Sequence, residues 1–511
     1  MTAVGTEQEY AEPYLRGVLA TAGLDVEYTR GEANTLYYNR DGREVGVLDF
    51  VGGYGSTLLG HSHPELIEYA RELLAGQTPI HAQFSRHPYA NRVAAQLNRI
   101  LRRELDSEEN YYAIFANSGA EAIEAGMKHA ELERFSRIAG LRAEIEANVA
   151  MARAAVEGGR ARAEDIDAVV AAVNEHNQPL FDSTPLFLTP VGSFHGKLAG
   201  SVQLTYNPVY RTVFSALAAQ ARFVPVHEPG ALDEIVAAER RDLHDLEIAD
   251  DQVRVVSRPF PVFCALVLEP ILGEGGIHEL PVEFAKDVNR VATDLGIPVV
   301  IDEIQAGMGR TGAFLSSSHL GLRGDYYAMA KSLGGGIAKA AVLLVRESRY
   351  QRDFEMMHSS TFAKDSFSCL IAEKVLTILE ANDGEVYRTV ARRGTELLNA
   401  LHALQAEFPT VIAEVRGRGL MAGLEFVNQA ESPSRVLREL DGGGFFGYYV
   451  SGFLLREYNI RTFPTSSAVY TLRFEPSVHL DTSEINRLVT ALREVCREIR
   501  DADGRRLAAI A

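Results

Sequence analysis

Short, unbroken apolar runs that end at a polar residue constrain the fold of this chain more than any other feature. Residues 262–268 end at Glu269, and residues 298–301 end at Asp302. Unbroken apolar sequences are typical of strands that are buried on both faces. Because a helical stripe at 284–295 separates the two runs, the pattern predicts an α/β fold with a mostly parallel central sheet flanked by helices. In such sheets ligands bind beyond the carboxyl ends of the strands.

The length of the chain predicts more than one domain. A chain of 511 residues is too long for a single hydrophobic core. We expect residues 76–371 to form a large domain that binds the ligand. Residues 1–75 are expected to contribute to a smaller α+β domain, which residues 372–511 complete.

Residues 133–187 differ in composition from the rest of the predicted large domain. Ala, Glu and Arg dominate this segment, and Gly158 and Gly159 lie in its middle. We predict two helices, at about 133–156 and 163–175, that form a helical insertion on the surface. Its role is open between a solvated coat and a site for a partner.

Charge and cysteine content exclude several classes of protein. The chain has a formal net charge of −18, which argues against a broad basic face for nucleic acid or an anionic membrane. No apolar run reaches the roughly 18 residues of a membrane-spanning helix. Residues 1–12 lack the apolar stretch of a signal peptide. Cys264, Cys369 and Cys496 are far apart and have no metal-type spacing. We therefore expect a cytoplasmic protein.

A loop rich in small residues, 117–121, connects a predicted strand to a predicted helix. Ser118, Gly119 and Ala120 in this loop would let the backbone approach an anion closely. The N-terminus of the following helix offers unpaired N–H groups and a partial positive charge, which suits a phosphate. Many α/β loops contain a Ser-Gly pair, so the loop alone does not distinguish a phosphate site from an ordinary connection.

Three further residues have side chains that could serve a cofactor. A carboxylate at the end of a buried strand, as at Asp302, is costly unless it is paired; a helix cap, an arginine partner and a protonated pyridinium nitrogen are the alternatives. Small and apolar residues flank Lys331, and burial there would give a neutral amine suited to imine formation. Phe194 could stack on a cofactor ring or simply fill the core.

Taken together, these motifs resemble those of the class III aminotransferases that depend on pyridoxal 5′-phosphate (PLP), which have the type I fold of PLP enzymes. The 29-residue spacing from Asp302 to Lys331 is the most specific element. The matching segments run in family order from about residue 35 to residue 490: 59–64, 117–121, 194–196, 269–276, 301–312, 330–331, 360–362, 415–420 and 472–476.

The resemblance implies a role for each residue of the predicted site. Lys331 would form the imine with PLP, and Asp302 would pair with the ring nitrogen of the cofactor. The other implied cofactor contacts are Ser118, Gly119 and Ala120 at the phosphate, Phe194 and Ile304 at the two ring faces, Gln305 at the ring hydroxyl, and Thr361 at the phosphate of a neighbouring subunit. His195, next to Phe194, is also expected among the cofactor-binding residues. The contact of Thr361 implies a homodimer with shared active sites.

The resemblance also bears on the substrates. Arg473 is similar to the family arginine that holds a substrate carboxylate, and Glu274 to a glutamate that covers its charge when the other substrate is bound. This pair implies a transaminase that moves an amino group from a glutamate-like donor to an aldehyde or keto acceptor, either free or tethered to a carrier protein. No metal site is predicted, because His61 and His63 lack a third ligand at suitable spacing.

Two alternatives to transamination can be compared with the same motifs: another PLP-dependent reaction, and a chain that keeps the fold without catalysis. Racemisation, decarboxylation and aminomutase chemistry all use the same electron sink of the cofactor, so the cofactor-binding residues do not discriminate between them. Glu274 and Arg473 favour transamination. A chain that kept the fold without catalysis would be expected to lose Lys331 or Asp302, and both are present.

Overall fold

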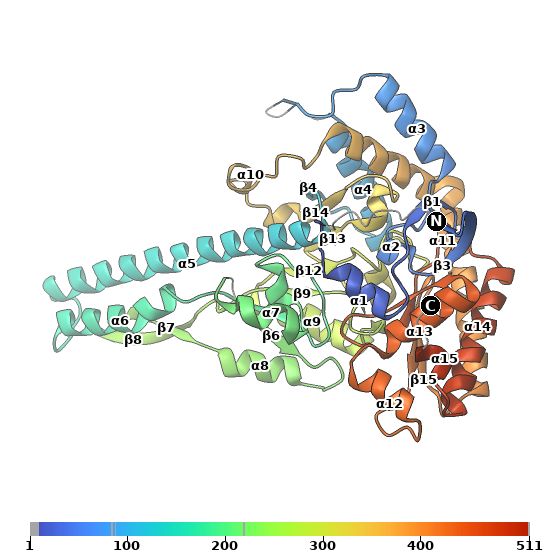
Figure 1. Ribbon diagram of the computed structural model, residues 1–511. Coiled ribbons are helices and arrows are strands. Elements are labelled where there is room, and N and C mark those ends of the chain that lie inside the picture. Colours follow the sequence, from blue (N-terminus) through green and yellow to red (C-terminus); the bar gives the residue numbers. More distant parts are fainter. Residues whose placement is uncertain (1–9, 83–84, 87, 218–219, 509–511) are drawn as a thin grey trace.

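A seven-stranded sheet forms the centre of the protein in the computed structural model, which describes residues 10–82, 85–86, 88–217 and 220–508 (Figure 1). The strand order is β4-β14-β13-β12-β9-β5-β6. From β13 to β6 every neighbouring pair is parallel, whereas β14 is antiparallel to both of its neighbours. The predicted α/β fold with a mostly parallel sheet is therefore confirmed. The strands are β4 (Tyr111–Ala116), β5 (Leu186–Pro190), β6 (Gln220–Val224), β9 (Phe263–Leu268), β12 (Val299–Asp302), β13 (Tyr326–Met329) and β14 (Ala341–Arg346).

Helices cover both faces of this sheet, which explains the unbroken apolar sequences of its strands. Every residue of β9, β12 and β13 is buried. In α9, Phe284, Val288 and Val291 turn inward, and the helix ends at Gly296, whose φ of 65° suits glycine. The covering helices include α4 (Pro88–Leu105), α5 (Gly119–Glu157), α8 (Ala231–Glu239) and α9 (Val282–Leu295), and α11 (Ser366–Glu407) packs against α4. Among the described residues, no helix is both long and apolar enough to cross a membrane.

The predicted insertion is part of an arm that projects from the body of the protein (Figure 1). The arm consists of the distal half of α5, then α6 (Ile166–Phe181), and a hairpin of β7 (Asp242–Ala249) and β8 (Gln252–Pro259). It has its own apolar cluster, to which Ile145, Val173 and Leu243 belong. The first predicted helix, 133–156, is not a separate element. It is the C-terminal part of α5, which begins at the 117–121 loop and runs without a break to Glu157.

The N-terminal and C-terminal segments are joined by a parallel strand pair. Strand β17 adds to β3 in the sheet β1-β2-β3-β17, and a second sheet has the order β15-β16-β19-β18. This pairing supports the proposed smaller domain built from both ends of the chain. The elements are α1 (Leu15–Thr21), β1 (Tyr28–Glu32), β2 (Thr35–Arg40), β3 (Arg43–Asp49), α2 (Gly52–Gly55), α3 (Pro64–Ala75), β15 (Ile412–Arg418), β16 (Met421–Phe426), α12 (Arg435–Gly442), α13 (Phe446–Tyr458), β17 (Ile460–Arg461), β18 (Phe463–Pro464), β19 (Thr471–Phe474) and α14 (Thr482–Arg500).

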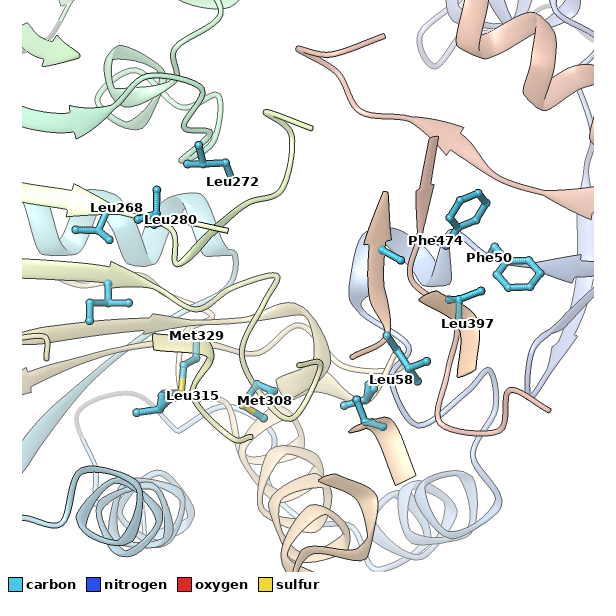
Figure 2. Close-up of a cluster of buried hydrophobic side chains, with 14 of the residues drawn as sticks. Phe50, Leu58, Leu268, Leu272, Leu280, Met308, Leu315, Met329, Leu397 and Phe474 are labelled. Carbon is cyan, nitrogen blue, oxygen red and sulfur yellow. The ribbon is translucent and has the colours of Figure 1, made fainter. Parts of the chain in front are cut away.

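One apolar core connects the central sheet to these terminal segments (Figure 2). The rings of Phe50 and Phe474 meet edge to face, with centroids 5.9 Å apart. Met308 and Leu58 belong to the same cluster and lie between these rings and the central sheet in Figure 2. The packing fixes β19 relative to the loop that follows β12, so residues distant in sequence can form one site.

Candidate active site

A cavity of about 450 Å³ lies at the carboxyl ends of the parallel strands. Nine of the residues predicted from the sequence line it: Ser118, Gly119, Ala120, Phe194, His195, Asp302, Ile304, Gln305 and Lys331. Glu274 and Arg473 are near enough for their charges to act on the Lys331 amine. Thr361 is not among the lining residues. The structure thus brings together all but one of the predicted site residues.

The anion-binding end of the cavity is the N-terminus of α5. Ser118 caps the helix, since its Oγ accepts a hydrogen bond of 3.3 Å from the Glu121 backbone N–H. The Glu121 carboxylate in turn accepts from the backbone N–H groups of Asn117 and Ser118, at 2.6 and 3.1 Å. The next N–H groups, of Gly119 and Ala120, have no partner within the helix because they belong to its first turn. They are available to an anion in the cavity.

Glycine is required where the chain comes closest to this end of the cavity. A Cβ on Gly119 would lie 2.7 Å from Ile304 Cδ1. Gly196 has a φ of 114°, and a Cβ there would lie 2.5 Å from that of Ala120. The two glycines therefore let the loops after β4, β5 and β12 meet around the cavity, as the predicted small-residue loop requires.

Asp302 is a buried carboxylate held in one orientation. Its Oδ2 lies 2.8 Å from His195 Nδ1, and its Oδ1 accepts a 3.0 Å hydrogen bond from the Ile304 backbone N–H. His195 is itself buried and lies 3.2 Å from Thr189 Oγ1. Among the described residues no arginine pairs with Asp302, so that alternative from the sequence is wrong. The histidine contact is a role that the sequence motif did not reveal.

Lys331 is at the end of β13, in a backbone conformation that non-glycine residues adopt uncommonly. Its φ is 49°, and such left-handed residues concentrate at functional sites. Burial lowers the pKa of the Lys331 amine, and the nearby Glu475 and Glu274 carboxylates offset only part of this effect. More of the amine is therefore neutral, and nucleophilic, than in an exposed lysine.

Glu269 has a structural role that sequence reasoning did not identify. It is the residue after β9, and its Oε1 accepts a 2.8 Å hydrogen bond from the Phe194 backbone N–H. Its Oε2 accepts a 3.2 Å bond from the Gly273 backbone N–H. Burial, together with the charge of Asp302, raises the pKa of Glu269 well above its ordinary value. Through these two hydrogen bonds, the Glu269 carboxyl group holds the loop that carries Phe194 in place beside the cavity.

Glu274 and Arg473 form a buried ion pair next to the cavity. Both guanidinium Nη atoms donate to the carboxylate, and the Arg473 Nη2 bond to Glu274 Oε2 measures 2.7 Å. The same Oε2 accepts a 2.8 Å hydrogen bond from the Ser466 backbone N–H. The two residues that the resemblance associated with substrate binding therefore contact each other directly.

Gln305 contacts a carboxylate that is not among the predicted site residues. Its Nε2 donates a 2.7 Å hydrogen bond to Oε1 of Glu475, a fully buried residue. Because side chains alternate along an extended chain, the side chains of Glu475 and Arg473, two residues apart, are expected on the same face of it. That alternation is the signal that could have placed Glu475 near the site.

Thr361 lies in the loop between α10 (Phe354–Met357) and α11. The neighbouring Ser360 Oγ accepts a 2.8 Å hydrogen bond from Asn117 Nδ2, so this loop packs beside the 117–121 loop of its own chain. Met356 and Phe362 of the same segment are exposed. The contact of Thr361 with a second subunit stays a prediction.

The residues around the cavity fit PLP. The helix N-terminus suits a phosphate, the buried carboxylate Asp302 suits a protonated ring nitrogen, and Lys331 supplies an amine of lowered pKa. Such a site on an α/β fold defines a PLP-dependent enzyme. Residues 20–453 match the aminotransferase class-III family. The chain belongs to the class-III aminotransferases, whose cofactor is PLP, and the predicted activity and cofactor are confirmed.

Similar proteins agree with this family. A putrescine aminotransferase from Pectobacterium atrosepticum is 26% identical over 501 residues, covering 96% of this chain and 88% of that protein. The structure is similar to a thermostable six-fold mutant of an omega transaminase from Pseudomonas jessenii, with a TM-score of 0.71, 19% identity and 98% of both chains covered. It also resembles ornithine aminotransferase from Toxoplasma gondii, with a TM-score of 0.67, 20% identity, and 97% of this chain and 93% of the other covered.

Proposed function

We propose that this aminotransferase takes its amino group from a glutamate-like donor and passes it to an aldehyde or keto acceptor. The carboxylate of the donor would bind Arg473, whose planar guanidinium can donate two parallel hydrogen bonds. The observation that carries the proposal is the Glu274–Arg473 ion pair, because it supplies a substitute carboxylate when the bound substrate has none. The similarity to a protein named putrescine aminotransferase supports an amine without that carboxylate as the other substrate.

The residues around the cavity have distinct proposed roles in holding the cofactor. Lys331 would hold it covalently through Nζ, and the 118–120 backbone would hold its phosphate. Phe194 and Ile304 would pack on the two faces of the ring, and Gln305 would lie at its hydroxyl. When bound, the cofactor supplies an electrophilic carbon and an electron sink for the carbanion that forms on the substrate.

Two side chains would manage the protons of the reaction. Asp302, oriented by His195, would keep a proton on the ring nitrogen of the cofactor, since a nearby carboxylate favours the charged form of a base. The Lys331 amine would accept the proton that leaves the substrate Cα at Nζ and, as the ammonium, would later return a proton as the acid of the transfer. A buried amine of lowered pKa is suited to both directions of this transfer.

The proposed working form is a cytoplasmic homodimer in which Thr361 of each subunit reaches the phosphate site of the other. Exposed Met356 and Phe362 in the same segment supply apolar surface for such an interface. The three free, buried cysteines are compatible with a reducing compartment. The amino acceptor is a small molecule, either free or carried by another protein.

The proposal is tested by mixing the purified, PLP-loaded enzyme separately with glutamate and with a panel of amines, including putrescine. We expect glutamate and at least one carboxylate-free amine to abolish the visible absorbance of the bound cofactor as each transfers its amino group. The Lys331→Ala variant is the matched control. Conversion by amino acids only, or loss of the α-hydrogen without release of a keto acid, would contradict the proposal and favour decarboxylase or racemase chemistry.

A further inference from the structure

We propose that Glu475 is the positioning residue of Gln305: its carboxylate fixes the orientation of the Gln305 amide, and through that amide it acts on the ring hydroxyl of the cofactor. The inference deepens the proposed function, since it rests on the proposed contact between Gln305 and the ring hydroxyl. Glu475 itself would contact neither substrate nor cofactor. Its influence would pass through one hydrogen bond, so it should disappear when either Gln305 or the ring hydroxyl is removed.

A hydrogen bond joins the two side chains directly. Gln305 Nε2 donates to Glu475 Oε1 at 2.7 Å, and both residues are buried. Of the two, only Gln305 is among the residues that line the cavity. Gln305 is therefore the group through which Glu475 is connected to the cavity.

The chemistry of the two groups fixes which end of the amide faces Glu475. A carboxylate only accepts hydrogen bonds, whereas an amide donates from its nitrogen and accepts at its oxygen. If the amide turned over, Gln305 Oε1 would face the carboxylate oxygen, and neither atom could donate. The oxygen end of the amide is closely fitted as well, because a Cβ on Gly273 would lie 2.5 Å from Gln305 Oε1. The amide is thus confined at both ends.

Arg310 supplies the positive charge that a buried carboxylate needs. It is fully buried and donates to three backbone carbonyl oxygens, including that of Pro476, the residue after Glu475. No carboxylate among the described residues accepts a hydrogen bond from it. Burial lowers the pKa of Arg310 to about 10, and the charge of Glu475 opposes this fall. Because Arg310 is not bonded to Glu475 Oε1, that oxygen is left to Gln305.

The backbone of residues 52–55 holds the pair from another side. A Cβ on Gly52 would lie 2.1 Å from the Glu475 carbonyl oxygen, and Gly52 has a φ of 54°. A Cβ on Gly55 would lie 3.4 Å from Glu475 Oε1 and 3.5 Å from Gln305 Cγ. The segment therefore packs on both members of the pair, and the glycines make this close approach possible.

This arrangement connects the substrate side of the site with the cofactor side. Arg473 is part of β19, and Glu475 is the residue that follows this strand. One short segment would therefore hold the substrate carboxylate through Arg473 and orient the cofactor contact through Glu475. An amide that is fixed before the cofactor binds loses little freedom on binding, so its hydrogen bond contributes more to the affinity.

The test measures the Kd of pyridoxamine phosphate for the cofactor-free enzyme by calorimetry, because this ligand binds without a covalent bond to Lys331. In Glu475→Gln the new side chain can donate as well as accept, so the Gln305 amide loses its fixed orientation. The Kd should rise by about three- to tenfold, which corresponds to the weakening of one hydrogen bond. Glu475→Leu, which offers no acceptor, should raise the Kd at least as much.

Two controls isolate the route through Gln305. In a Gln305→Ala background, Glu475→Gln should change the Kd by less than about twofold, because the amide through which it acts is gone. The 3-deoxy analogue of pyridoxamine phosphate, which lacks the ring hydroxyl, should bind the wild type and Glu475→Gln with Kd values that also agree within about twofold. The Tm of each cofactor-free variant verifies that it is folded.

Three results would overturn the inference. They are an unchanged Kd in Glu475→Gln, an effect of this substitution that persists in the Gln305→Ala background, and an equal effect on the 3-deoxy analogue. In the last two cases Glu475 would act through its charge or through the fold. An unchanged Kd in Gln305→Ala alone would remove the proposed contact of Gln305 and the inference with it. The proposed amino transfer fails or stands separately, since these binding measurements need no turnover.

Discussion

Glu274 and Arg473 lie 199 positions apart in the sequence and form a bidentate ion pair beside Lys331. Burial alone would raise the pKa of Glu274, but the charge and hydrogen bonds of Arg473 and the Ser466 N–H group lower it to about 2. The carboxylate therefore remains ionised at any pH at which the enzyme works. To uncover Arg473 for a substrate, Glu274 must give up three hydrogen bonds.

The first prediction concerns Arg473→Lys, which keeps the charge but loses the two-pronged donor. The half-reaction with glutamate should be weakened by about 2 kcal/mol or more, because one hydrogen bond to the carboxylate is lost. The half-reaction with a carboxylate-free amine should be affected less. Stopped-flow absorbance measures each half-reaction separately.

Glu274→Gln is the matched counterpart of that variant. It leaves the Arg473 charge without its ionised partner when a carboxylate-free amine is bound, so that half-reaction should slow while the glutamate half-reaction is spared. Equal effects of both substitutions on both half-reactions would remove the argument for two alternating substrates.

The second prediction concerns Asp302→Asn. Without the carboxylate the ring nitrogen of the cofactor loses its proton, so the barrier should rise by several kcal/mol, at about 1.4 kcal/mol per tenfold in rate. Cofactor retention should fall much less, because Lys331 and the 118–120 loop remain. Steady-state rates and cofactor content after dialysis are compared; a variant that turns over at nearly the wild-type rate contradicts the pairing.

The third prediction concerns the shared active sites. Subunits carrying Lys331→Ala and subunits carrying Thr361→Ala are each expected to be inactive. Mixed after partial unfolding, they should form heterodimers in which one site has both native residues and regains activity. Size-exclusion chromatography and mass spectrometry verify that the heterodimers form. If verified heterodimers stay inactive, Thr361 does not serve the neighbouring site.

The fourth prediction concerns the pH dependence of stability and involves His129. This residue is fully buried; its Nδ1 lies 2.7 Å from the Tyr326 hydroxyl oxygen, and its Nε2 accepts a 2.9 Å bond from the Gln351 backbone N–H. Burial lowers the pKa of His129 to about 4. Since the folded pKa lies below the unfolded value of about 6.5, the neutral ring contributes stability above pH 6.5 that is lost as the pH falls through 4.

The variant His129→Gln tests this behaviour. Glutamine can still accept from the Gln351 N–H but does not titrate. Its Tm at pH 8 should be below that of the wild type, yet it should fall less between pH 6.5 and pH 4. Calorimetry at several pH values measures both, and parallel Tm profiles for the two proteins would rule out His129 as a source of acid lability.

The sequence predicted those parts of the site that local patterns define. Asp302 ends an unbroken apolar run, so its place at the carboxyl end of a buried strand could be predicted, and the small and apolar residues on both sides of Lys331 indicated that its amine would be buried. Glu475 ends no such run; only its two-residue spacing from Arg473 could have indicated its place, because its partner Gln305 comes from a distant segment and meets it through tertiary packing. The β7–β8 hairpin was also missed: exposed and partly buried residues are mixed along β8, which lacks the unbroken apolar run of a central strand.

The most direct test of the account is the identity of the lysine that carries PLP. Borohydride reduction of the PLP-loaded enzyme, followed by proteolysis and mass spectrometry of the peptides, fixes the cofactor to that lysine irreversibly. Lys339 also lines the cavity and is the natural competitor. We expect the label on Lys331, and we expect Lys331→Ala to bind PLP without covalent labelling. Label on Lys339, or on any other lysine, would contradict this expectation.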